Sequence, residues 1–232
     1  MKMVIKKNID VFKNTLKMLK TLHYESTLDT TGEQVKIGGV LADTYGGITF
    51  EKEFFDEYET GECYGVILND LFNIISKYKE VTIQTDGGCL KITSGKDEYK
   101  IPIIDDVEKN DIGKLTELKH DIMIKTTFDE LNDILSKLKF TKGSCFKIGA
   151  KDNQIFFEIK ELSKTAKINF KSMDIEKETN VFLSFDSLTP FNIKSSDELE
   201  IHMGTDIPVK IIYTQPNMEF IFYRAQRIDY DG

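Results

Sequence analysis

The sequence carries one short pattern twice, at a constant shift of 119 positions. At that shift, apolar residues in the first half of the chain fall on apolar residues in the second half. The clearest pairs are Ile5 with Ile124, Phe12 with Leu131, Leu16 with Leu135, Phe72 with Phe191 and Leu90 with Val209. Two generic amphipathic patterns can coincide by chance. A single shift that holds for elements spread along 232 residues nevertheless favours two copies of one domain.

Each copy reads as a strand, a helix and then a series of strands. Spacings of three and four between apolar residues predict helices over residues 8–23, 68–79, 127–140 and 186–194. The short runs between them, bounded by Gly and Asp, predict antiparallel strands, and Asp86-Gly87 predicts a hairpin turn. The expected fold class is therefore α+β, with two similar domains.

A charged segment interrupts this pattern near the middle of the chain. It lacks the period-two alternation of a strand, and its apolar residues are scattered. We therefore expect an N-terminal domain over residues 1–104, a connecting linker over 105–120 and a C-terminal domain over 121–232. Each domain has about 110 residues, which is enough to bury a hydrophobic core.

Charge and residue usage exclude several classes of protein. The chain has 31 Lys plus Arg against 39 Asp plus Glu, a formal net charge of −8, and its only arginines are Arg224 and Arg227. Bidentate Arg is the usual reader of bases in the major groove, so sequence-specific DNA recognition is not expected. The negative charge also argues against nucleic-acid binding over the whole surface, but it allows positive charge confined to one face.

The remaining composition predicts an intracellular protein with no membrane partner. Cys63, Cys89 and Cys145 are an odd number at wide spacing and provide no disulfide framework. The uncharged stretches are too short to span a bilayer, and the first ten residues lack the apolar segment of a signal peptide.

Three strings make the chain similar to a known family. They are LDTTGEQVKIGGVLADTYGGITF (28–50), MGTDIPVKIIY (203–213) and FIFYRAQRIDYDG (220–232). Together with the duplicated halves and the acidic linker, their order and spacing resemble the sliding clamps of the proliferating cell nuclear antigen (PCNA) family over nearly the full length. The resemblance implies a trimeric ring, homomeric or heteromeric, with strands forming the outer sheets and four helices lining the inner face.

The resemblance also implies the partners. Such a ring encircles double-stranded DNA without regard to sequence, and it tethers DNA polymerase, a clamp loader and other replication and repair proteins through short peptide motifs. Its location would be cytoplasmic with the nucleoid in an archaeon, and nuclear or host-dependent in a eukaryote or virus. Two alternatives stay open: a specialised clamp for DNA damage, viral use or a mixed ring, and a duplicated β-rich interaction domain that forms no ring.

Lysines on the predicted helices are the candidate DNA-facing residues. A hydrated point charge on a flexible stem attracts phosphate without fixing a register, which suits a ring that slides. The alternative is that helices in general favour Lys near the C-terminus, where it complements the macrodipole. The candidates are Lys13, Lys17 and Lys20 on one stripe of the first helix, and Lys77, Lys79, Lys137, Lys139 and Lys194 near the ends of the others.

The resemblance further implies a pocket for a partner's peptide motif beneath the linker. The matching positions are Val40, Tyr45, Val107, Ile112, Leu115, Pro208, Tyr223, Ala225 and Gln226. Several of them would also suit ordinary packing at strand ends. The chain has Arg224-Ala225-Gln226 where the family usually has Leu-Ala-Pro, and this departure fits either a different choice of partner or a specialised subunit of a heteromeric ring.

Ring closure in the family pairs edge strands of neighbouring subunits, which leaves neither edge exposed. The alternative is that charged residues merely cap both edges. The matching positions here are Glu98, Tyr99, Lys100, Ile101 and Ile103 in the first half, and Thr165, Lys167, Ile168 and Phe170 in the second.

The sequence shows no catalytic motif. His23, His120 and His202 lack metal-ligand spacing, and the glycines form no phosphate-binding loop. Cys63 has no obvious basic partner, which favours a core position over a nucleophile. We therefore expect a protein that is not an enzyme and that holds no metal and no cofactor.

Overall fold

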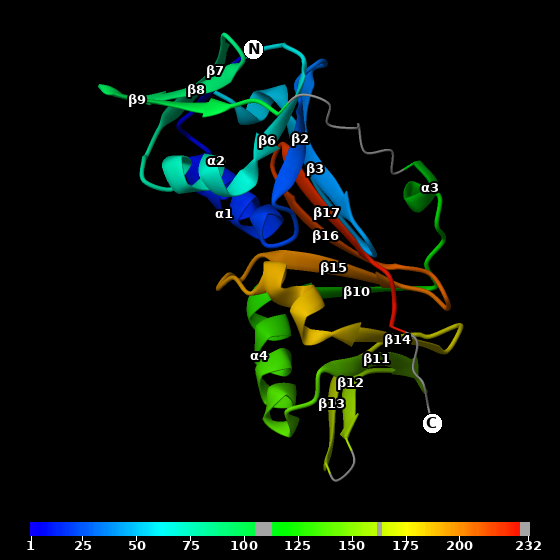
Figure 1. The fold of residues 1–232 in the computed structure, drawn as a ribbon. Coiled ribbons are helices and arrows are strands. Elements are labelled where there is room, and N and C mark those ends of the chain that lie inside the picture. The colour runs from blue at the N-terminus through cyan, green and yellow to red at the C-terminus, as the bar shows by residue number, and fades with distance from the viewer. Residues whose placement is uncertain (105–112, 162–163, 228–232) are drawn as a thin grey trace. The chain divides into compact units, whose positions relative to one another are not determined.

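The computed structural model describes residues 1–104, 113–161 and 164–227, and their contacts divide the chain into two compact units (Figure 1). Unit 1 comprises Met1–Asp111 and Thr214–Ile221, and unit 2 comprises Ile112–Tyr213 and Phe222–Gly232. The domain boundaries expected from the sequence stay a prediction. They assign Thr214–Ile221 to the second domain, whereas its contacts group it with unit 1.

Among the described residues, nine antiparallel strands lie wholly within unit 1. They are β1 (Lys2–Ile5), β2 (Glu25–Asp29), β3 (Gln34–Leu41), β4 (Thr44–Glu51), β5 (Glu57–Glu59), β6 (Cys63–Ile67), β7 (Val81–Asp86), β8 (Cys89–Ser94) and β9 (Asp97–Pro102). One set of neighbours has the order β5-β1-β7-β8-β9 and the other β4-β3-β2-β6. A 3₁₀ turn, η1 (Lys52–Phe54), follows β4.

The predicted hairpin at Asp86-Gly87 is confirmed. Asp86 pairs with Cys89 across a two-residue turn, and both intervening glycines have positive φ, 56° at Gly87 and 79° at Gly88. A two-residue turn of this kind requires left-handed backbone at both central positions, which glycine adopts without steric cost.

Two helices of unit 1 pack against each other, as Figure 1 shows in blue and cyan. Helix α1 (Ile9–Lys20) buries Ile9, Phe12, Leu16 and Leu19, the apolar stripe expected from the spacing. Helix α2 (Leu68–Ile75) is shorter than predicted. After Ile75 the backbone N–H groups of Lys77 and Tyr78 bond to carbonyls three residues back, so the chain turns toward β7.

Unit 2 repeats the mixture of strands and helices. Its strands are β10 (Ile122–Thr127), β11 (Cys145–Lys151), β12 (Gln154–Glu161), β13 (Lys164–Ser172), β14 (Thr179–Ser184), β15 (Glu198–Met203), β16 (Val209–Gln215) and β17 (Met218–Arg224). The end of β16 and the start of β17 fall among the residues of unit 1. One set of neighbours has the order β13-β12-β11-β14 and the other β10-β15-β16-β17.

The long helix of unit 2 has a well-defined start. In α4 (Phe128–Leu138) the Thr127 hydroxyl accepts from the Glu130 backbone N–H at 3.1 Å, and the Glu130 carboxylate accepts from the Thr127 N–H at 3.2 Å. This capping box satisfies two N–H groups that the helix leaves free. A 3₁₀ turn, η2 (Lys139–Thr141), follows the helix, and a one-turn helix, α3 (Gly113–Thr116), precedes β10.

The fourth predicted helix is corrected by the structure. Residues expected to form it adopt a 3₁₀ helix, η3 (Phe185–Phe191), and Lys194 lies beyond its end. Pro190 lies inside η3 and has no N–H to donate, which favours a short 3₁₀ segment over a longer α-helix.

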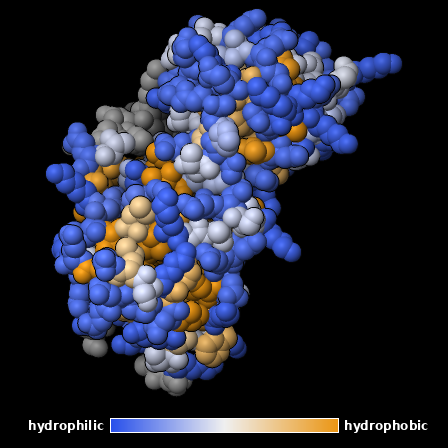
Figure 2. Space-filling view, turned by 180° about the vertical axis from the view of Figure 1, so that it is seen from behind, coloured by the Kyte–Doolittle hydropathy of each residue, from blue (hydrophilic) through white to orange (hydrophobic). Residues whose placement is uncertain are grey.

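Aromatic rings fill the core of each unit. In unit 1 the Phe50 ring lies 5.2 Å from Phe12 and 4.5 Å from Phe54, measured between centroids. In unit 2 the Phe128 and Tyr213 rings meet edge to face at 5.0 Å. The face seen in Figure 2 is mostly hydrophilic, with hydrophobic residues in separate patches. No helix in the described part of the chain combines the length and apolarity needed to cross a bilayer.

Candidate functional site

The predicted lysine stripe forms on α1, but its three members have different surroundings. Lys17 is exposed, and none of the described residues forms an ion pair with it. The side chain of Lys13 is only 19% exposed, and its Nζ lies 3.6 Å from Asp10. Lys20 lies over the Phe72 ring of α2, with Nζ 4.1 Å from the centroid. The stripe therefore offers one exposed charge and two that are partly covered.

The other candidate lysines lie at or beyond helix ends. Lys77 and Lys79 follow α2, and Lys194 follows η3; all three are exposed. Lys137 on α4 is paired with Asp133, one turn earlier on the same helix. Lys139 lies on η2 with its Nζ 5.7 Å from the Phe185 ring centroid.

Strand β9, which carries most of the first predicted contact segment, is the last strand of its sheet. Glu98 and Lys100 are exposed on it, whereas Ile101 is 7% exposed and belongs to the core. Lys100 pairs with Asp86 at 2.6 Å, and this hydrogen bond lowers the pKa of the Asp86 carboxyl. Ile103 lies one residue beyond the strand, and its N–H donates to the Gly88 carbonyl at 3.0 Å.

Tyr99, the remaining predicted residue of β9, belongs to a short hydrogen-bonded chain. Its hydroxyl lies 2.6 Å from the Tyr78 hydroxyl, which donates in turn to Asp97 at 2.9 Å. The hydrogen bond with Tyr99 raises the pKa of Tyr78. This network keeps both rings at the sheet edge in a fixed arrangement.

Strand β13, the second predicted contact segment, is likewise the last strand of its sheet. Thr165 and Lys167 are exposed, and Ile168 and Phe170 are half-buried on the opposite face. The Lys167 Nζ lies 4.0 Å from the centroid of the Phe156 ring, so the ammonium group itself makes a cation–π contact with that ring. Both predicted segments therefore lie at sheet edges whose outer backbone groups can accept another strand.

A pocket of about 420 Å³ in unit 2 contains three of the predicted partner-binding residues. Pro208, Ala225 and Gln226 line it together with five others: Asn180, Phe182, Asp206, Ile207 and Arg227. The Arg227 backbone N–H donates to the Phe182 carbonyl at 3.0 Å, which holds the end of the chain segment after β17 against β14. Half of the lining residues are apolar, namely Phe182, Ile207, Pro208 and Ala225, and the other half are polar or charged.

The other predicted pocket residues have varied locations. Val40 and Tyr45 pair across the β3–β4 hairpin of unit 1, and Val40 is 53% exposed. Leu115 lies in α3 and is half-buried. Tyr223 is 2% exposed, so its side chain is part of the core. Val107 and Ile112 lie outside the described residues.

Sequence reasoning missed the five additional lining residues for two reasons. Asp206, Ile207 and Arg227 are close neighbours in sequence of predicted residues, so a wider window around Pro208 and Gln226 would have included them. Asn180 and Phe182 lie on β14, far away in the sequence, and no local pattern signals that β14 approaches the pocket.

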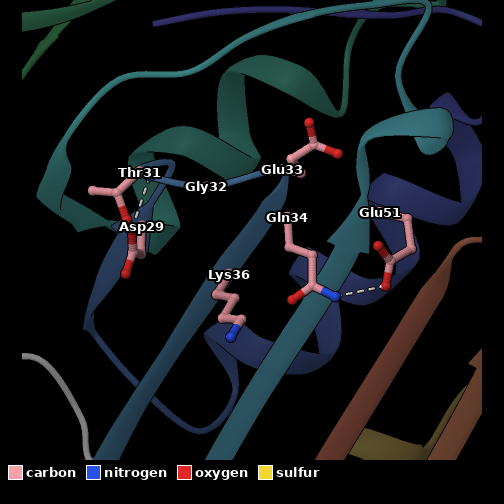
Figure 3. A pocket seen from close by; sticks show the side chains of 7 residues that line it. All are labelled: Asp29, Thr31, Gly32, Glu33, Gln34, Lys36 and Glu51. Carbon is pink, nitrogen blue, oxygen red and sulfur yellow. Dashed lines mark hydrogen bonds between the residues drawn. The ribbon is translucent and has the colours of Figure 1, made fainter.

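Unit 1 contains a different hollow of about 350 Å³, shown in Figure 3. It lies along the β2–β3 hairpin and the end of β4, and its lining is polar. Thr31 bonds to Asp29, and the Gln34 amide donates to Glu51 at 2.8 Å. Glu33 is paired with Lys52, next to this hollow. Because these polar groups are exposed or half-buried and several of them are bonded to each other, the hollow does not single out a ligand.

Comparison with known proteins identifies the fold. No protein-family profile and no curated protein sequence matches the chain. Among solved structures, a chain of the PCNA2–PCNA3 complex from Sulfolobus tokodaii is 22% identical, with a TM-score of 0.82 over 98% of this chain and 99% of that one.

Two further PCNA structures agree. A. fulgidus PCNA, solved with the C-terminal region of FEN-1 bound, is 18% identical with a TM-score of 0.84, and 99% of each chain is covered. PCNA from Thermococcus kodakaraensis is 14% identical with a TM-score of 0.85, covering 97% of this chain and 99% of that one. The chain therefore has the α+β fold of the PCNA sliding clamps, across both of its units.

Proposed function

We propose that this protein is a DNA sliding clamp, a polymerase processivity factor that encircles duplex DNA as a trimeric ring. The observation that carries the proposal is the likeness to PCNA structures over 97–99% of the chain at TM-scores of 0.82–0.85. This likeness extends over both units. It therefore favours a protein that uses its whole chain as PCNA does, over an unrelated protein that shares only one domain with PCNA.

The two sheet edges support ring closure. β9 ends one sheet of unit 1 and β13 ends one sheet of unit 2, so each subunit offers one edge to each neighbour. Head-to-tail pairing of two different edges generates a ring when the rotation between subunits closes. The Tyr78–Tyr99 network and the exposed residues of β13 would then be covered by the neighbouring subunit.

The lysine stripe of α1 supports the attraction to DNA. In a chain with a net charge of −8, Lys13, Lys17 and Lys20 lie on a single helix that also carries one acid, Asp10. Weak, sequence-independent contacts to phosphate hold a duplex without stopping its movement through a ring. Catalysis by this chain has no part in the proposal.

The pocket of unit 2 supports the recruitment of other proteins. A short peptide gains affinity by placing an apolar side chain in such a pocket, with a few hydrogen bonds to fix its direction. A. fulgidus PCNA was solved with the C-terminal region of FEN-1, so a protein of this fold binds a terminal peptide region of a partner. We assign polymerases and other replication and repair enzymes to the pocket as partners of this chemistry.

Retention on DNA tests the proposal. The protein is incubated with nicked circular plasmid, and gel filtration at high salt follows, before and after the plasmid is cut once. A topological link survives salt on the circle and is lost from free ends, whereas electrostatic binding is lost from both. Equal loss from circular and cut plasmid would contradict the sliding clamp, and light scattering should give about three times the 26.7 kDa chain mass.

A second candidate is that this chain is one subunit of a mixed ring. Lys164, Lys167 and Lys171 are exposed along β13, while exposed β9 residues include both Glu98 and Lys100. Like charges directly opposite each other destabilise a strand pair, so β13 fits a more acidic edge than β9. The Sulfolobus tokodaii structure is itself a complex of two different PCNA chains. A monomeric mass that becomes trimeric only when related chains are added would favour this candidate.

A further inference from the structure

The loop 204–208, which joins β15 to β16, forms one side of the pocket in unit 2. It is a tight loop. Asp206 has a φ of 58°, and a Cβ added at Gly204 would approach the Ile207 Cδ1 to 2.5 Å. Ile207 therefore packs directly on the Gly204 backbone, and the loop leaves no room for a side chain at that position.

Three side chains from other segments hold this loop by its backbone. The Asp121 carboxylate accepts from the Thr205 N–H at 3.3 Å and is itself held by Lys177 at 3.0 Å. His120 Nε2 lies 2.9 Å from the Pro208 carbonyl, which can only accept, so the ring nitrogen donates. These two contacts fix the side of the loop that faces β10.

Gln226 fixes the side that belongs to the pocket. Its Nε2 donates to the Gly204 carbonyl at 2.7 Å and to the Ile207 carbonyl at 2.6 Å. Gln226 also lines the pocket from the segment that follows β17. One carboxamide therefore ties together the two walls, the loop with Ile207 and Pro208, and the strand exit with Ala225 and Gln226.

The hydrogen-bond capacity of this carboxamide determines what it can offer a ligand. A Gln side chain has two N–H donors and one carbonyl acceptor, and both donors are used by Gly204 and Ile207. The Gln226 side chain can therefore still accept a hydrogen bond from a ligand, at its carbonyl oxygen Oε1. The two backbone carbonyls are likewise already bonded at the pocket, so a ligand's donor group gains less by approaching them than it would if they were free.

We propose that Gln226 is the positioning residue of this pocket and sets the chemistry of its partner. The pocket takes a peptide that inserts an apolar side chain between Ile207, Pro208 and Ala225 and donates a hydrogen bond to the Gln226 side-chain oxygen. A peptide that depends on donating to the Gly204 and Ile207 carbonyls is disfavoured. This inference rests on the proposed function, because it assumes that the pocket binds a partner peptide.

Peptide binding and one spectroscopic signal test it together. The probe is the FEN-1 C-terminal region found in the A. fulgidus PCNA structure, labelled for fluorescence anisotropy. Gln226→Met keeps the length of the side chain but removes both the amide donors that tie the loop and the oxygen that accepts from the peptide, and we expect it to weaken probe binding by about tenfold. Gln215→Met makes the same chemical change outside the pocket, and we expect binding to stay within about twofold of the wild type. Ala225→Trp fills the pocket and should abolish binding.

The spectroscopic signal addresses Gln226 in the unmutated protein. Its side-chain NH₂ resonances, assigned by their loss in Gln226→Met, should exchange with solvent more slowly than those of Gln215, because both hydrogens are bonded. Slow exchange must persist when the probe saturates the protein. Exchange as fast as that of Gln215, or release of the amide on binding, would overturn the inference even if Gln226→Met proved unstable.

The outcomes distinguish a failure of the role of Gln226 from a failure of peptide binding by the pocket. If Ala225→Trp abolishes binding while Gln226→Met leaves it unchanged, the pocket stands and the role of Gln226 is wrong. If the wild type does not bind the probe, or Ala225→Trp binds it normally, the pocket's proposed function fails and the inference fails with it. If Gln226→Met weakens binding at a temperature where the variant is still folded, and Gln215→Met does not weaken it, the inference holds.

Discussion

Helices α1 of unit 1 and α4 of unit 2 correspond in the repeat, yet they present opposite charge. α1 carries Lys13, Lys17 and Lys20 against Asp10, whereas α4 carries Asp129, Glu130 and Asp133 against Lys137. Their buried stripes are alike, with apolar residues at the same spacing. A duplicated fold thus preserves the residues that pack and leaves the exposed face of each copy free to change.

The difference extends to how each helix begins and what its lysines contact. α4 starts with a capping box at Thr127, whereas Asn8 before α1 makes no side-chain cap and instead donates to the Phe54 carbonyl at 2.6 Å. Acidic side chains near a helix N-terminus interact favourably with the helix macrodipole. Asp129 and Glu130 therefore stabilise α4, although the same carboxylates would repel phosphate. For the sliding clamp proposed above, we therefore expect α1 to attract DNA more strongly than α4 does.

The largest expected effect is on the hydrophobic core of each unit, where α1 and α4 bury similar apolar stripes. Phe12→Ala should lower the free energy of unfolding by about 3–5 kcal/mol, because Phe12 is fully buried against Phe50 and Phe54. Phe128→Ala, at the start of α4, should cost a similar amount. Phe140→Ala, which removes a side chain 62% exposed, is the control and should cost little in guanidinium unfolding. A small effect at Phe12 would show that unit 1 has no comparable core.

The second effect is acid sensitivity of unit 1. His23 is 5% exposed, and burial lowers its pKa from 6.5 to about 4. Between these values the unfolded chain binds a proton that the folded chain does not. The contribution of neutral His23 to the free energy of unfolding is therefore fully present above pH 6.5. It is lost as the pH falls toward 4, by about 3 kcal/mol in total.

Two variants sharpen this prediction. His23→Phe should flatten the loss of melting temperature between pH 6.5 and 4, whereas His202→Gln in unit 2 should retain most of it. Burial also lowers the pKa of His202, but its hydrogen bond to Glu200 opposes that effect. If NMR titration of the folded wild type shows His23 taking up its proton near pH 6.5, the prediction is wrong.

The third effect is on the affinity for duplex DNA, and it tests the charge difference between α1 and α4. Replacing Lys13, Lys17 and Lys20 together by Ala should weaken binding to a duplex by about tenfold at low salt. The slope of log affinity against log salt should fall by about 0.9 for each phosphate that the variant no longer neutralises. Lys137→Ala on α4 should change affinity by less than about twofold, because Asp133 already pairs with that lysine. Equal effects from the two helices would break the comparison.

The smallest effect is on helix initiation. Thr127→Ala removes the hydroxyl that caps α4 and should lower the free energy of unfolding by about 1 kcal/mol. Ser136→Ala, on an exposed position of the same helix, should change it by less than about 0.5 kcal/mol, measured by urea unfolding. If the two substitutions cost the same, the capping box does not stabilise α4 as its geometry indicates.

Local patterns predicted much of this structure because they report local physics. The apolar spacing that predicts α1 requires one face of a helix to be buried, and Asp86-Gly87 predicts a turn because the backbone there must be left-handed. The lysine stripe was likewise visible, since residues three and four apart share a helix face. Its partial cover was not, because Phe72, which lies beneath Lys20, belongs to another helix.

The amino-acid sequence by itself determined the duplication, the placement of the main helices and the positive stripe of α1, all of which follow from periodicity along a single element. Only the tertiary structure decided three features: which strands end a sheet, that β14 brings Phe182 to the pocket, and that the Gln226 side chain donates to two backbone carbonyls of loop 204–208. The physical reason is that hydrogen bonds and packing join residues by distance in space, and separation along the chain carries no signal of which distant segments will meet.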